Sequence, residues 1–216
     1  MEDNYRHKGL RKKLVEEIRE MGLEDPKVLD AINAVPRHAF MDTAFLNFAY
    51  TNKAFPIGAG QTISQPYTVA VQTWLLDIQA GMKILEVGTG SGYQTAVLCE
   101  MGAKVYSIER QKPLFSKAKQ LLKKLGYEAY LTYGDGYKGL TGYAPYDGIV
   151  VTCGAPTLPE TLLNQLKIGG KIVIPVDENG DLQRMKRYLK KAENQIVEED
   201  YGAFKFVPML QNRSDG

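Results

Sequence analysis

The chain has 216 residues, and its 27 basic and 25 acidic side chains give a formal net charge of +2. This balance excludes the strongly basic surface that is typical of nucleic-acid-binding proteins. No apolar run approaches the ~18 residues of a membrane span, the N-terminus is polar, and two histidines with two separated cysteines predict no metal site. We therefore expect a cytoplasmic monomer without a nucleic-acid or membrane partner.

The N-terminal third has the pattern of short amphipathic helices. Apolar residues at helical spacing over 10–21 predict a first helix that ends at Gly22. Asp25-Pro26 predicts the capped start of a second helix, which ends before Pro36. Asp42 can cap a third short helix, after which a loop is expected. These elements do not belong to a nucleotide-binding unit, so they form an elaboration of one.

The segment 56–67 has the sequence PIGAGQTISQPY, and Pro66 begins a helix that is expected to run to Gly81. Ser64 therefore lies at a helix N-terminus, where free backbone N–H groups and the helix dipole favour an anion. Two roles remain open for its hydroxyl from the residues alone. It can cap the helix, or it can donate a hydrogen bond to an anionic ligand.

The stretch 83–93, KILEVGTGSGY, predicts a buried strand, a tight glycine turn and a helix that begins near Tyr93. The spacing G-x-G-x-G, with Glu86 before the first glycine, favours a cationic cofactor with one nucleoside. A nicotinamide-linked oxidoreductase would need G-x-G-x-x-G, with the third glycine one position later. The candidate cofactor-binding residues of this stretch are Glu86, Gly88, Thr89, Gly90, Ser91 and Gly92.

Strand and helix patterns alternate from Lys83 onward and predict an α/β fold with a doubly wound, mostly parallel sheet. The tail differs, because 178–181 has the composition of a hairpin turn between two alternating, antiparallel strands. The expected parallel strands lie at 83–87, 105–108, 128–133, 146–152 and 171–176, and the antiparallel strands at 182–189 and 195–207.

Ligands of such sheets bind beyond the carboxyl ends of the strands, where the strand order reverses. Glu109 ends the second strand, 17 residues after Gly92, which is close to the spacing at which a carboxylate accepts the hydroxyls of a ribose. Asp135, between Gly134 and Gly136, follows the third strand and is placed to meet an adenine amino group. The three loops together resemble the S-adenosyl-L-methionine site of Rossmann-like class I methyltransferases.

Motifs along residues 10–210 extend the resemblance to one family. They are PRHAF at 36–40, IGAGQTISQP at 57–66, EVGTGSGY at 86–93, GDG at 134–136, YDGIVVTCGAP at 146–156 and FVP at 206–208. The chain resembles the protein-L-isoaspartate (D-aspartate) O-methyltransferases. The resemblance implies methylation of the free α-carboxylate of L-isoaspartyl residues, and possible D-aspartyl sites, in damaged proteins and peptides, followed by succinimide formation and partial return to aspartate.

The resemblance also implies roles for single residues. Ser64 is the residue that the family assigns to the active site, here as a positioning donor, because an ionised carboxylate needs no general base. Lys205 stands where many relatives have arginine, and Met209 where leucine is usual, which affects the fine detail of substrate binding. The implied substrate-binding residues are Gln61, Thr62, Ile63, Ser64, Val207 and Pro208.

Two other functions are weighed against this one. A nucleic-acid amino methyltransferase would carry an Asn/Asp-Pro-Pro-aromatic element after the fourth strand, where this chain has TCGA at 152–155. An inactive module that binds the cofactor or damaged peptides without turnover remains open. We expect one domain over 1–216, with a helical elaboration at 1–66, a cofactor-binding core at 67–176 and an antiparallel extension at 177–216.

Overall fold

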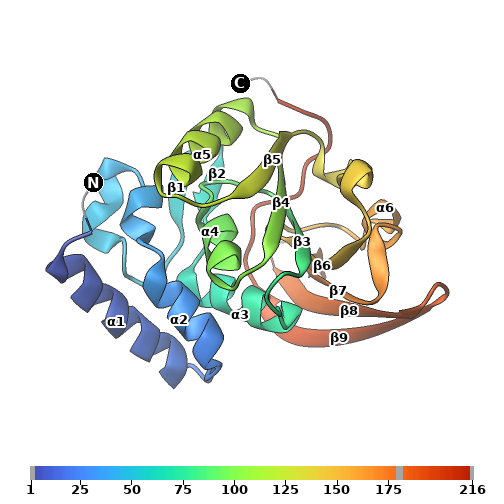
Figure 1. The fold of residues 1–216 in the computed structure, drawn as a ribbon, viewed down its shortest axis with the longest axis horizontal. Coiled ribbons are helices and arrows are strands. Elements are labelled where there is room, and N and C mark those ends of the chain that lie inside the picture. The colour runs from blue at the N-terminus through green and yellow to red at the C-terminus, as the bar shows by residue number, and fades with distance from the viewer. Residues whose placement is uncertain (1–2, 179–181, 215–216) are drawn as a thin grey trace.

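The computed structural model describes residues 3–178 and 182–214. Its centre is a 7-stranded sheet of order β5-β4-β3-β6-β7-β8-β9, in which β3 to β7 run parallel and β8 and β9 are antiparallel (Figure 1). The predicted mostly parallel sheet with an antiparallel edge is confirmed. The strands are β3 (Lys83–Val87), β4 (Lys104–Glu109), β5 (Ala129–Tyr133), β6 (Tyr146–Val151), β7 (Leu166–Asp177), β8 (Gln183–Ala192) and β9 (Gln195–Phe204).

The strand order reverses at β3, which lies between β4 and β6. The loops that follow these three strands therefore meet at the carboxyl ends of the strands, as the sequence predicted. β7 begins at Leu166 and not at Lys171, and its pairing with β6 has an irregularity between Tyr146 and Gly148. The turn predicted at 178–181 falls largely on residues 179–181, which lie outside the described residues.

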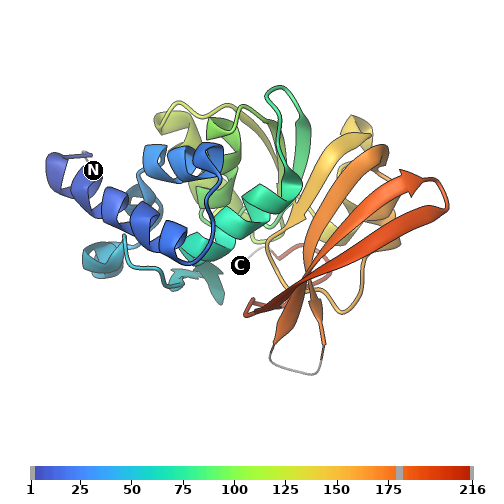
Figure 2. The same ribbon diagram turned by 90° about the horizontal axis from the view of Figure 1, so that it is seen from below.

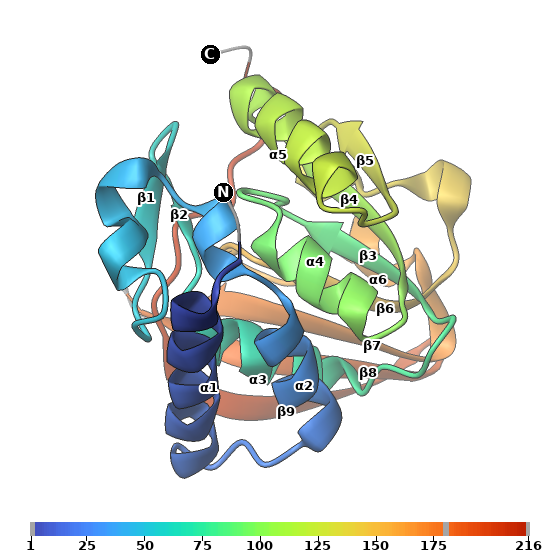
Figure 3. The same cartoon turned by 60° about the vertical axis from the view of Figure 1, so that its left-hand side comes forward.

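Side chains of neighbouring strand residues enter two cores, one on each face of the sheet. Ile84 packs with the helices α3 (Pro66–Leu76), α4 (Tyr93–Glu100) and α5 (Lys112–Lys124), whereas Leu85 packs on the opposite face near α6 (Glu160–Leu163). This alternation follows from the two-residue period of a strand. Figure 3 shows α1 (Tyr5–Glu20) and α2 (Pro26–Ala34) outside α3 and α4, as a second helical layer.

The caps of the N-terminal elements agree with the sequence. Asp25 accepts the backbone N–H groups of Lys27 and Val28 at the start of α2, and Asp42 accepts that of Ala44. The third helix, Thr43–Phe48, is a 3₁₀-helix. Figure 2 shows this blue N-terminal layer at one end of the molecule and the red strands of the antiparallel edge at the other.

Three local features differ from the expectation. A 3₁₀-helix, Arg37–Phe40, follows α2, and the expected loop contains the hairpin β1 (Phe55–Gly58) and β2 (Gln61–Ile63). Such short elements leave no periodic pattern in a sequence. The helix α3 ends at Leu76 and not at Gly81, because Asp77 adopts a left-handed conformation with φ of 52°.

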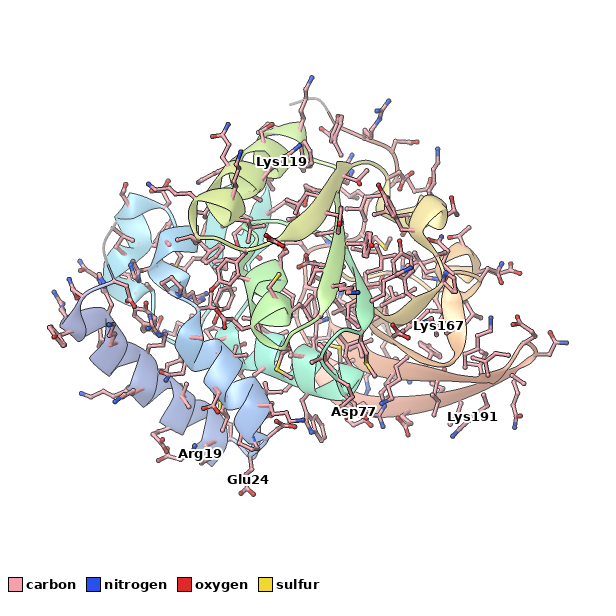
Figure 4. All side chains as sticks on the ribbon, viewed as in Figure 1. Arg19, Glu24, Asp77, Lys119, Lys167 and Lys191 are labelled. Carbon is pink, nitrogen blue, oxygen red and sulfur yellow. The ribbon has the colours of Figure 1, made fainter. Side chains whose placement is uncertain are left out.

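Charged side chains of both signs lie around the periphery of the molecule (Figure 4). Asp77 pairs with Lys171 at 2.7 Å and Lys167 with Asp147 at 2.6 Å. No helix in the described part of the chain combines the length and the apolar character needed to cross a membrane. The labelled examples in Figure 4 are Arg19, Glu24, Asp77, Lys119, Lys167 and Lys191.

Candidate functional site

A pocket with about 770 Å³ of empty space, counted out to its mouth, opens at the carboxyl ends of β3, β4 and β6. Its walls come from parts of the chain that are far apart in sequence. One wall is the glycine turn after β3, a second is β2 with Ser64 after it, and a third is the chain after β9. The lining includes 61–64, 87–91, 108–110, 152–153 and 207–210.

The glycine turn between β3 and α4 has backbone conformations that side chains disfavour. Gly88 has φ of 98°, and a Cβ there would lie 2.4 Å from Oγ1 of Thr152. That hydroxyl donates to the Gly88 carbonyl at 2.6 Å and holds the turn against the end of β6. Gly90 has φ of 54° and lies at the pocket. The turn thus lines the pocket with backbone that carries no side chain at Gly88 and Gly90, and its contact with a cofactor stays a prediction.

Glu109, the last residue of β4, lines the pocket and fixes the glycine turn. Its carboxylate accepts the backbone N–H of Gly90 at 2.8 Å through Oε2 and that of Gln111 at 2.8 Å through Oε1. A carboxylate has about four lone-pair sites, so each oxygen can accept a further bond. The side chain is therefore placed to accept hydroxyl donors of a ligand in the pocket.

Glu86 does not line the pocket. Its carboxyl is fully buried behind the glycine turn, where it accepts hydrogen bonds from the hydroxyls of Thr95 and Ser107. Burial raises the pKa of Glu86 to about 8, so the buried group favours its neutral form. The residue joins β3, β4 and α4, and its contact with a cofactor stays a prediction.

The Gly-Asp-Gly turn after β5 contributes its second glycine, Gly136, to the pocket. The carboxylate of Asp135 accepts the backbone N–H groups of Tyr137 and Asn212, each at 3.0 Å. Its predicted contact with adenine stays a prediction, as do contacts of Gly92 and Gly134, which also lie outside the lining. The predicted cofactor residues that the structure brings together are Gly88, Thr89, Gly90, Ser91, Glu109 and Gly136.

All four residues from Gln61 to Ser64 line the pocket. Gln65 is the N-cap of α3 and its side chain makes no capping bond, whereas the side chain of Asn52 accepts the backbone N–H of Tyr67 in the first turn at 3.0 Å. The hydroxyl of Ser64 forms no hydrogen bond to another residue in the described parts of the chain. Of the two roles that the sequence left open, capping is thus absent, and the hydroxyl is free to donate to a ligand.

The chain after β9 crosses the carboxyl ends of the strands and closes the pocket. Val207 and Pro208 line it, and their contact with a substrate stays a prediction. The carbonyl of Val207 accepts the N–H of Gly154 at 2.8 Å, and the N–H of Met209 donates to the Gly154 carbonyl at 2.6 Å. Met209 is buried in the second core and also reaches the pocket, whereas Lys205 is exposed and outside the lining.

Sequence reasoning missed several lining residues. Thr152 and Cys153 follow β6, and their place at the end of a parallel strand could have identified them. Burial raises the pKa of the Cys153 thiol to about 12, so this thiol stays protonated and unreactive at neutral pH. Tyr93 and Gln94 begin α4 and also line the pocket. The sequence did not identify them, because buried residues at the start of a helix usually belong to the core.

One group of possible metal ligands occurs among the described residues, and it lies in the N-terminal layer. Ligand atoms of Asp3, His7 and His38 lie within 4.8 Å of one another. Both carboxylate oxygens of Asp3 accept from Arg11, and the two imidazole rings stack at 3.9 Å. His7 Nδ1 and His38 Nε2 have no hydrogen-bond partner within the described part of the chain, but the Arg11 cation that pairs with Asp3 disfavours a metal ion beside it.

Comparisons with known proteins agree on one family. The protein-family model described as protein-L-isoaspartate(D-aspartate) O-methyltransferase matches residues 9–214 of this chain. The protein-L-isoaspartate O-methyltransferase of Christiangramia forsetii is 57% identical over 99% of this chain and the whole of that protein. That of Cytophaga hutchinsonii is 56% identical over 97% of this chain and 95% of the relative.

Two solved structures are similar over 94% of this chain. A protein-L-isoaspartate O-methyltransferase superimposes with a TM-score of 0.85 at 29% identity, and the match spans 66% of that chain. A Plasmodium falciparum protein described as a beta-aspartate methyltransferase, in complex with S-adenosyl-L-homocysteine, superimposes with a TM-score of 0.82 at 25% identity over 99% of its length.

Proposed function

This chain belongs to the protein-L-isoaspartate(D-aspartate) O-methyltransferase family, and from that premise we propose how its pocket performs the family's reaction. The fold is that of the class I S-adenosyl-L-methionine-dependent methyltransferases. The protein is a repair methyltransferase that esterifies the free α-carboxylate of L-isoaspartyl residues in damaged proteins and peptides. The ester then forms a succinimide, whose hydrolysis restores part of the damage to aspartate.

The residues of the pocket fit S-adenosyl-L-methionine, which supplies an electrophilic methyl group when bound. We propose that the turn 88–91 receives it, because Gly88 and Gly90 line the pocket with backbone that carries no side chain. Glu109 accepts the ribose hydroxyls with the lone pairs that Gly90 and Gln111 leave free. Glu86, Gly92, Gly134 and Asp135 remain predicted contacts of the cofactor.

The substrate carboxylate requires positioning and protection from water. A carboxyl group with a pKa of ~3.9 is ionised at neutral pH, so no residue needs to remove a proton from it. Ser64 donates its free hydroxyl to one carboxylate oxygen and leaves the other to attack. Thr62, Ile63, Val207 and Pro208 cover the pair and exclude water, which strengthens the hydrogen bond and aligns the reacting atoms.

One observation carries this assignment. The unpartnered hydroxyl of Ser64 lines the same pocket as the bare backbone of the glycine turn. Donor and cofactor site therefore face a common space in which a carboxylate and a methyl group can meet.

Finer properties of the protein also follow as proposals. We propose that it works as a monomer in the cytoplasm, on protein and peptide substrates, without nucleic-acid or membrane partners. The near-balanced charge and the absence of a helix able to cross a membrane in the described residues support this view. The whole chain acts as one domain, in which 1–66 and 177–216 complete a core at 67–176.

The test uses S-adenosyl-L-methionine labelled in its methyl group and two synthetic peptides. The peptides have the same sequence and differ in one linkage, which is L-aspartyl in one and L-isoaspartyl in the other. Base-labile label is expected on the isoaspartyl peptide alone, since only that linkage leaves an α-carboxylate free. Equal labelling of both peptides, or of neither when cofactor binding is confirmed, would contradict the proposal. The second result would favour a module that binds without turnover.

A further inference from the structure

Arg37 is a fully buried cation with no anionic partner among the described residues. Its guanidinium donates to three backbone carbonyls, those of Ala49 at 2.7 Å, Lys53 at 2.9 Å and Ser64 at 3.1 Å. These acceptors are neutral. Burial lowers its pKa to about 10, which still leaves the group protonated at neutral pH. Burial of an unpaired charge lowers the stability of the folded protein, so we look for a functional role that explains this charge.

A second buried arginine of this fold shows the usual solution. Arg11 is 6% exposed, and both its terminal nitrogens pair with the carboxylate of Asp3. It also donates to Tyr50 and to the carbonyl of Asn33. The two arginines therefore differ in one respect, which is that the charge of Arg11 is compensated within the chain and that of Arg37 is not.

Arg37 lies outside the pocket lining and contacts residues of two of its walls. It holds the backbone of Ser64, which belongs to the substrate wall. Its guanidinium carbon also lies 5.6 Å from the ring centroid of Tyr93, the first residue of the helix after the glycine turn, and Tyr93 lines the pocket as well. The positive charge is thus next to the serine that faces the ligand and is separated from water.

We propose that Arg37 is a positioning residue whose counter-charge is the carboxylate of the bound substrate, a role that rests on the proposed methylation of isoaspartyl carboxylates. Its charge attracts the anion into the low-dielectric pocket, and its hydrogen bond to the Ser64 carbonyl fixes the serine whose hydroxyl receives that anion. Arg37 acts through Ser64 and through its field, without touching the reacting atoms.

The two effects separate in the kinetics. The carboxylate loses its negative charge as the ester forms, so a nearby cation stabilises the bound substrate more than the transition state. Loss of the charge therefore raises KM for the peptide, whereas loss of the fixed Ser64 backbone lowers kcat. Neither effect involves the cofactor-binding residues, so the affinity of the protein for the cofactor should stay unchanged.

The experiment compares full-length Arg37→Gln, Arg37→Lys and the matched control Arg11→Gln with the wild-type protein. Peptide KM and kcat are measured with an isoaspartyl peptide, and the dissociation constant of S-adenosyl-L-homocysteine by calorimetry. Arg37→Gln is expected to raise KM about tenfold or more. Arg11→Gln is expected to lower the melting temperature and to leave KM within about twofold of wild type.

Arg37→Lys adds a readout that a purely structural role would not change. The same burial lowers the pKa of an introduced ammonium toward the neutral range, so KM should rise as pH increases between about pH 6 and pH 9. The phenols that act on this position are those of Tyr50 and Tyr93, and burial raises both pKa values, that of Tyr93 to about 12. They stay neutral over this range, and the wild-type KM should stay constant.

The proposal fails if folded Arg37→Gln keeps the wild-type KM. It also fails if the KM of Arg37→Lys does not change with pH, and this second arm decides the matter should Arg37→Gln not fold. Failure of the proposed function has a different signature, because the wild-type protein would then not methylate the isoaspartyl peptide at all.

Discussion

Glu86, one residue before the end of β3, and Glu109, at the end of β4, both lie near the glycine turn, yet only one of them lines the pocket. Glu109 reaches the pocket, whereas Glu86 is sealed beneath the turn with Thr95 and Ser107. The sequence identified both acids by their spacing from the glycines. It could not predict which one faces a ligand, because that depends on the packing of α4 against the sheet.

The buried carboxyl of Glu86 predicts a pH dependence of stability. Between its ordinary pKa of 4.5 and the raised value of about 8, the unfolded chain is ionised and the folded chain retains the proton. The folded state binds more protons in this window, so the free energy of unfolding falls as pH rises. In Glu86→Gln this contribution is absent. Relative to wild type, the variant should gain a few kcal/mol of stability across the window.

Urea unfolding of wild type and Glu86→Gln at several pH values measures this difference. The gap between the two free energies of unfolding should widen as pH rises and then level off. Curves that stay parallel throughout would show that Glu86 is ionised in the folded protein.

The segment after β9 is the element whose contacts link most of the pocket's walls. Beyond its bonds to Gly154, it reaches the turn after β5 through Asn212, whose N–H donates to Asp135 at 3.0 Å. It ends beside β4, where the N–H of Ser214 donates to the Arg110 carbonyl at 2.8 Å and that of Lys112 to the Ser214 carbonyl at 3.0 Å. In Figure 1 this red trace runs from the sheet's edge toward α5.

Truncation after Leu210 should weaken cofactor binding. It removes the bonds to Asp135 and Arg110 but keeps Val207 and Pro208 in the chain, so the cover over the pocket loses its far attachment. We expect the dissociation constant of S-adenosyl-L-homocysteine to rise about tenfold by calorimetry, as for the loss of one or two net hydrogen bonds.

The matched control is Arg213→Ala, which removes a side chain that lies 5.3 Å from the ring centroid of Tyr133 and keeps the backbone bonds. It should bind the cofactor product as wild type does. Wild-type affinity in the truncated protein would show that the far attachment does not hold the cover.

Elements with a sustained period were predictable and short ones were not. The strands β3 and β5 and the helix α2 lie close to their expected bounds, since each has a regular apolar pattern and a turn or cap at its end. The helix α1 ends as expected but begins at Tyr5, five residues before its predicted start. The hairpin β1–β2 was expected as a loop, because β2 has 3 residues and cannot show alternation. Its turn, with positive φ at Gly58, Ala59 and Gly60, was visible only as a glycine-rich stretch.

At the scale of the whole molecule, a topological rule predicted where the site lies. The carboxyl ends of the parallel strands lie on one side of the sheet. The switch of strand order at β3 brings the loops after β3, β4 and β6 together there. No local rule predicts that the segment before α3 and the chain after β9 both fold over the carboxyl ends of these strands. The helix start made Ser64 a candidate anion donor, but its place beside the cofactor pocket, and that of Val207, were predicted from family resemblance.

The central claim is that the pocket at the carboxyl ends of the strands is one site, in which Ser64 positions an isoaspartyl carboxylate against the cofactor's methyl group. The most direct measurement is the rate of methyl transfer to an isoaspartyl peptide by Ser64→Ala and wild type, with the dissociation constant of S-adenosyl-L-homocysteine determined alongside. The account predicts a rate lower by about tenfold or more, because the carboxylate loses its donor, with unchanged cofactor affinity. A wild-type rate in the variant would contradict it.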